Sequence, residues 1–168
     1  MLPNRFVRCI LISLTLILAV APFATVSAEG KPLHFPLYFT SPTTVTGVCP
    51  FDVLLESTMD KGHMSVHTED GTTRSILSGV LKLKITNLAN EKSMEWNNPA
   101  QCTFVNNSDG SGSTSCHGPS SWWPPMPEVG LPPFAFVKGT VSFSWDAKGK
   151  LTDYKVVGTV LDVCVALQ

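Results

Sequence analysis

Large apolar side chains gather in and after a proline-rich segment. Residues 119–133 contain six prolines, so we expect a long, stiff loop there rather than a helix or strand. A stiff loop loses little entropy when its aromatic side chains bind a partner. The predicted ligand-binding residues are Trp122, Trp123, Met126, Phe134 and Phe136. The alternative is that the loop covers one end of the fold and buries these side chains.

The histidines give little support to a metal or catalytic site. His63 and His67 lie in a segment with a strand pattern, where about 13 Å separates them, too far to share a zinc ion. Residues 107–110 lack the spaced carboxylates of a calcium loop. No nucleophile motif adjoins His117. The sequence therefore predicts no metal, no cofactor and no catalytic residue.

The cysteines after residue 28 are even in number, which indicates disulfides in an oxidising compartment. Cys102 and Cys116 are equidistant from Asp109, in a segment rich in turn formers, so they would face each other across a hairpin. The remaining pair is then Cys49 with Cys164.

The first 28 residues are typical of a secretory signal peptide. Arg5 and Arg8 precede an apolar run, and Val26-Ser27-Ala28 provides small residues for cleavage. We therefore expect a secreted, extracellular protein with no membrane segment after cleavage. The remaining chain has ten basic against 13 acidic residues and no basic cluster, which argues against nucleic-acid binding.

Alternating patterns indicate β-strands along the rest of the chain. Residues 134–164 resemble one long hairpin, in which we expect Val137 opposite Gly158 and Gly139 opposite Val156. Asp70-Gly71 predicts a tight turn between two further strands. Residues 29–48 contain three prolines and predict an extended arm or edge strand.

These patterns predict an all-β fold with one domain over residues 49–168. Gly79, Gly139 and Gly158 interrupt strand patterns without changing their phase, as bends in a tightly curved sheet do. We expect a single antiparallel β-barrel of about eight strands. A two-sheet β-sandwich is the alternative.

Both ends of the predicted domain resemble one group of proteins. Cys49-Pro50-Phe51 near the start, with Asp162 and Cys164 at the end, is similar to a group of small secreted proteins, mainly from actinomycetes. The resemblance implies secretion and a β-rich domain, and it transfers no active site.

Two functions remain open from the sequence. The first is a noncatalytic binding module for a small apolar ligand or a cell-surface partner. The second is a small barrel enzyme of cyclase or isomerase type that acts on an apolar substrate, with Tyr154, Asp153 or His117 as acid–base groups. Polar groups converging in a barrel lumen would favour the enzyme, and a sealed apolar core would favour the binding module.

Overall fold

The structure is a computed structural model, which describes residues 31–123 and 125–168. The predicted signal peptide, residues 1–28, lies outside the described residues. Residues Pro32–Gln168 form one compact unit.

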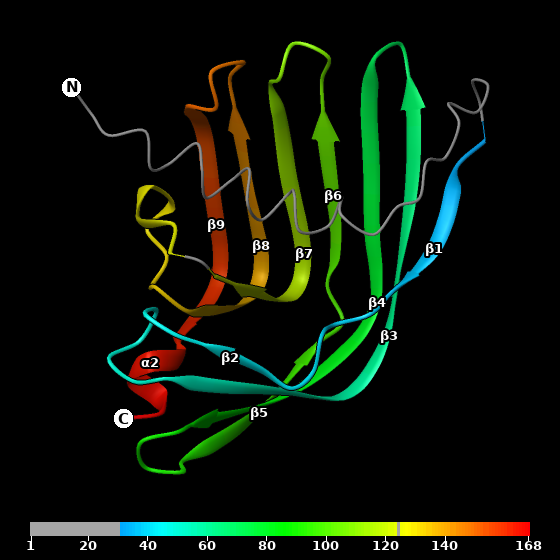
Figure 1. Cartoon of the computed structure of the whole chain (residues 1–168). Coiled ribbons are helices and arrows are strands. Elements are labelled where there is room, and N and C mark those ends of the chain that lie inside the picture. The colour runs from blue at the N-terminus through cyan, green and yellow to red at the C-terminus, as the bar shows by residue number, and fades with distance from the viewer. Residues whose placement is uncertain (1–30, 124) are drawn as a thin grey trace. The chain divides into compact units, whose positions relative to one another are not determined.

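Nine antiparallel strands form one sheet in the order β1-β3-β4-β6-β7-β8-β9, with β2 paired to β3 and β5 paired to β4 (Figure 1). A 3₁₀ turn (η1) and a one-turn helix (α2) accompany them. The elements are β1 (Leu33–Leu37), β2 (Thr43–Val45), β3 (Val53–Glu69), β4 (Thr72–Asn87), β5 (Ser93–Asn98), β6 (Gln101–Asn106), β7 (Gly112–Trp122), η1 (Pro127–Val129), β8 (Ala135–Trp145), β9 (Leu151–Asp162) and α2 (Val163–Ala166). The all-β prediction is confirmed.

The described strands do not close into the predicted barrel. Strands β1 and β9 end the strand order and do not pair with each other. Instead, the long strands β3 and β4 bend strongly, so that one part of the sheet turns across the others (Figure 1). The arm predicted for residues 29–48 contributes β1 and β2, which both pair with β3. Its Pro36 lies in the edge strand β1, where a missing backbone donor does not interrupt the sheet.

Paired glycines lie in one row across the sheet. Gly62 pairs with Gly79 on β3 and β4, and Gly139 pairs with both Gly118 and Gly158 on β7 to β9. The backbones approach closely there, because a Cβ atom on Gly139 would lie 1.9 Å from the carbonyl oxygen of Val157. This row, the glycine row below, divides the long strands into two parts.

The β8–β9 register differs from the predicted one by two residues. Gly139 pairs with Gly158, and Val137 pairs with Val160. The cause is a register shift next to the turn, where Trp145 pairs with Leu151 instead of Lys150. Because side chains alternate with a period of two, the shift leaves the side chains from Asp153 onward on their predicted faces, whereas Leu151, next to the turn, takes the place opposite Trp145.

The proline-rich loop begins after Trp122 rather than at Pro119, because β7 continues to Trp122. Pro119 pairs with Lys138 on β8. On the other side of β7, β6 starts at Gln101 opposite His117, so Pro119 has no partner there. A residue without a backbone N–H is tolerated in a strand at such an edge.

Two apolar clusters fill the fold. The larger one joins β3, β4, β5, the start of β8 and α2; its fully buried members include Val53, Leu55, Ile85, Phe134, Phe136 and Val163. The smaller one places Val129 and Leu131, from the loop around η1, against Ala135, Val137 and Val141 of β8. Strand β9 ends at Asp162, whose carboxylate accepts a hydrogen bond from the backbone N–H of Val165 and caps α2.

Candidate ligand-binding site

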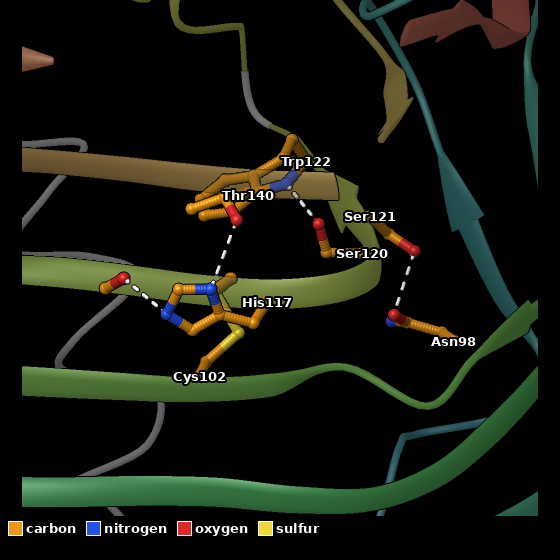
Figure 2. The surroundings of a disulfide bond; sticks show 9 residues. Asn98, Cys102, His117, Ser120, Ser121, Trp122 and Thr140 are labelled. Atoms are coloured by element: carbon orange, nitrogen blue, oxygen red, sulfur yellow. Dashed lines mark hydrogen bonds between the residues drawn. A yellow bond between two sulfur atoms is a disulfide. The ribbon is translucent and has the colours of Figure 1, made fainter. Parts of the chain in front are cut away.

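Both predicted disulfides are confirmed. Cys49 is bonded to Cys164, which ties the segment before β3 to α2. Cys102 and Cys116 face each other on β6 and β7, with their Cα atoms 4.0 Å apart (Figure 2).

The two tryptophans of the proline-rich segment pack against different clusters. Trp122 lies edge-on to Phe143 with 6.0 Å between ring centroids, and its Nε1–H donates to Ser120 Oγ at 2.8 Å (Figure 2). Trp123 lies 5.2 Å from Phe134, at the border of the larger cluster. Both are half-buried, so neither indole is freely exposed. Their opposite directions follow from their neighbouring positions in an extended segment.

The other predicted binding residues lie deeper. Phe134 and Phe136 have no exposed surface, and Met126 is half-buried against the smaller cluster. Contact of Trp122, Trp123 and Met126 with a ligand stays a prediction.

A row of aromatic rings in contact runs from the loop through the larger cluster. Trp123, Phe134, Phe136 and Trp96 follow one another with centroid distances of 5.2, 5.4 and 4.3 Å. The last two rings are stacked, with 13° between their planes. Trp96 comes from β5. The row of aromatic rings therefore connects β8 to a strand that is far from it in the order of the sheet.

A shallow hollow of about 190 Å³ lies at the Trp96 end of this row of rings. Strands β8 and β9 form one wall and β5 the other. Its lining residues are Trp96, Phe136, Lys138, Thr159 and Leu161. The pairs Phe136–Leu161 and Lys138–Thr159 lie directly opposite each other on β8 and β9. The lining is therefore apolar at the bottom and polar next to the glycine row.

Two polar groups at this hollow have few protein partners. Lys138 Nζ lies 5.5 Å from the centroid of the Trp96 ring, which is within the range of a cation–π interaction. None of the described carboxylates forms a salt bridge with Lys138. The buried Nε1 of Trp96 has no hydrogen-bond partner among the described residues. Of the two, the exposed Lys138 ammonium can donate hydrogen bonds to a bound molecule.

A second hollow, of about 260 Å³, lies against Trp96 as well. It is lined by Thr58, Lys82, Leu83, Glu95, Trp96 and Asn97. Here a lysine and a glutamate are both present, so the lining carries charges of opposite sign.

The acid–base candidates are not brought together. Tyr154 and Asp153 are neighbours on β9 and therefore point to opposite faces of the sheet. His117, on β7, contacts Ser115 Oγ at 3.2 Å and Thr140 Oγ1 at 3.1 Å (Figure 2). The described residues contain no group of three side chains that could hold a metal ion.

The carboxylates with shifted pKa values belong to turns. Backbone N–H groups of Lys150 and Lys148 lower the pKa of Asp146 in the β8–β9 turn. The Ser111 side chain and backbone lower the pKa of Asp109 in the β6–β7 turn. Both shifts reflect local hydrogen bonds that favour the ionised form, and neither residue lines either of the two hollows described above.

The sequence did not identify Trp96 or Lys138 as site residues. Trp96 looked like an ordinary core residue, and Lys138 like the outward member of an alternating strand. Their proximity depends on contact between β5 and β8, which are not neighbours in the sheet. The one feature of the sequence that could have pointed to this site was Trp96 itself, because it is a large side chain with a polar N–H in a short strand.

Comparisons of the chain with protein-family models, with curated proteins and with solved structures found no match.

Proposed function

We propose that the protein is a secreted, noncatalytic binding module whose hollow beside Trp96 takes a small, flat, apolar molecule. The observation that carries this proposal is the stacked Trp96–Phe136 pair that lines the hollow together with Leu161. Ligand sites in proteins are concave, mostly apolar and supplied with a few polar groups, and this hollow has that composition at a small size.

The disulfides support secretion, because two such bonds are typical of a protein from an oxidising compartment. The predicted signal peptide and the resemblance to small secreted proteins agree with this localisation.

Binding is preferred to the enzyme alternative because of where the polar groups lie. Neither Tyr154 nor Asp153 nor His117 lines the hollow. General acid–base catalysis needs such groups within hydrogen-bond reach of the substrate.

Titration of the ¹⁵N-labelled protein with benzyl alcohol tests the proposal. The chain has four tryptophans, so each indole N–H gives its own signal, assigned by single Trp→Phe variants. We expect a saturable shift of the Trp96 signal, while the signal of Trp145, whose Nε1–H is bonded to the Gly110 carbonyl, stays in place.

Two outcomes would contradict the proposed site. The absence of any saturable shift would remove the binding function for small apolar molecules. Shifts confined to Trp122 and Trp123 would move the site to the proline-rich loop, as the sequence predicted.

A further inference from the structure

We infer that the ligand of the Trp96 hollow is a small organic anion, with a flat apolar body against Leu161 and a carboxylate held by Lys138. This inference rests on the proposed function and adds the chemical class of the ligand. It follows from the polar groups that line the hollow, from the lack of a salt bridge to Lys138 among the described carboxylates, and from the charges of the residues that line the neighbouring hollow.

The polar side chains around the hollow are suited to an acceptor. They are the Lys138 ammonium and the Thr159 hydroxyl, both from exposed residues. An ammonium only donates, and a hydroxyl can donate as well. A ligand that presents oxygen acceptors would satisfy both groups, whereas a ligand with its own donors would satisfy only the hydroxyl.

The charge of Lys138 is available to a ligand. Its ammonium lies over the Trp96 ring without a salt bridge to any described carboxylate. A carboxylate at the mouth of the hollow would reach this ammonium while the apolar body of the same molecule lies against Leu161. Hydrogen bonds in which both partners are charged are among the stronger ones in proteins.

The size of the hollow agrees with a small ligand. A benzoate-sized molecule agrees with the hollow's volume of about 190 Å³.

The second hollow beside Trp96 lacks this selectivity. Lys82 lines it, but Glu95 lines it too. An anion there would be repelled by the glutamate as well as attracted by the lysine. Lys82 therefore provides a matched control, since it is a second exposed lysine next to the same indole.

The test compares benzoate with benzyl alcohol, which share the flat ring and differ in charge. Binding is followed by the Trp96 indole N–H signal in the wild type, Lys138→Met and Lys82→Met. We expect the wild type to bind benzoate about tenfold more tightly than benzyl alcohol, which corresponds to one charge-assisted contact. Lys138→Met should lose this preference, Lys82→Met should retain it, and Lys138→Arg, which keeps the charge, should retain most of it.

The outcomes separate the inference from the proposed function. If benzyl alcohol binds as tightly as benzoate to the wild type, the function stands and the anionic class is wrong. If Lys138→Met and Lys82→Met weaken benzoate equally, the preference arises from overall charge and the role of Lys138 is wrong. If neither probe shifts the Trp96 signal, the proposed function falls and this inference falls with it.

Discussion

The two ends of the bent sheet are built in different ways. At the closed end, β2, β5 and the adjoining parts of β3, β4 and β8 surround the larger cluster, in which Phe134 and Phe136 are fully buried. At the open end, which comprises β1, β6 and the parts of β3, β4, β7, β8 and β9 nearest the hairpin turns, one face of the sheet is polar. That face carries all four histidines of the chain, together with Ser78, Ser115, Thr140 and Ser142.

The glycine row lies between these ends, and so does the candidate site. Lys138 and Thr159 directly adjoin the paired Gly139 and Gly158, on the side of the closed end. The ring that they face, Trp96, belongs to the closed end. Apolar packing therefore stabilises the closed end. The close backbone approach in the glycine row brings the polar side chains of Lys138 and Thr159 next to that packed end.

Removing the disulfides separately should show the largest difference between the ends. Cys49 and Cys164 are separated by 115 residues, and Cys102 and Cys116 by 14. Loop-closure entropy predicts losses of about 5 and about 3 kcal/mol in the free energy of unfolding for the two double alanine variants. Urea unfolding checks both. Equal losses would contradict the view that the Cys49–Cys164 link, and with it the closed end, dominates stability.

A side chain in the glycine row should have the next largest effect. In Gly139→Ala the new Cβ would meet the Val157 carbonyl at 1.9 Å, so the β8–β9 pairing must separate locally. We expect a loss of about 3 kcal/mol. The matched control is Gly149→Ala, where φ is +75° and no atom lies within 4 Å of the new Cβ. The control should lose about 1 kcal/mol through its backbone conformation alone.

The same substitution also tests the position of the site. If Gly139→Ala folds but weakens benzoate binding more than Gly149→Ala does, the glycine row positions Lys138 over Trp96. Equal melting temperatures of the two variants would show that the close approach of β8 and β9 is not needed for stability.

Removing a polar side chain at the open end should have a smaller effect. His117 is exposed, and its hydrogen-bond partners, Ser115 and Thr140, can bind water in its place. We expect His117→Ala to change the free energy of unfolding by about 0.5 kcal/mol or less. Phe136→Ala, at the closed end, should lose about 3–5 kcal/mol. Thermal unfolding of both variants measures the two losses in the free energy of unfolding. A loss above about 2 kcal/mol in His117→Ala would show that the polar face also stabilises the fold.

The sequence predicted local pairings better than the arrangement of the strands. The Asp70-Gly71 turn and the Cys102–Cys116 pair follow from residues near each other in the chain, and both are confirmed. The contact of Trp96 with Phe136 joins strands that are not neighbours in the sheet, and alternation alone does not encode it. The closed barrel was expected from bending glycines, but glycines permit curvature without fixing whether the edges meet.

The smallest expected effect concerns the turn between β8 and β9 at the open end. The Asp146 carboxylate accepts hydrogen bonds from the backbone N–H groups of Lys148 and Lys150, both at 2.9 Å. The N–H groups of Lys150 and then Lys148 lower the pKa of Asp146 below its ordinary value of 3.8. A carboxylate with a lowered pKa stabilises the folded state above its unfolded pKa, and this contribution is lost as the pH falls through the folded pKa.

We therefore expect Asp146→Asn to lower the melting temperature slightly at pH 7, and the difference from the wild type to disappear when the pH falls below the lowered pKa of Asp146. Thermal unfolding between pH 7 and pH 2 measures this difference. Asp153→Asn, on the neighbouring strand β9, serves as the control for a general change in charge, because Asp153 is exposed and outside the turn. A difference that grows on acidification, or that Asp153→Asn reproduces, would show that the Asp146 hydrogen bonds do not stabilise the open end.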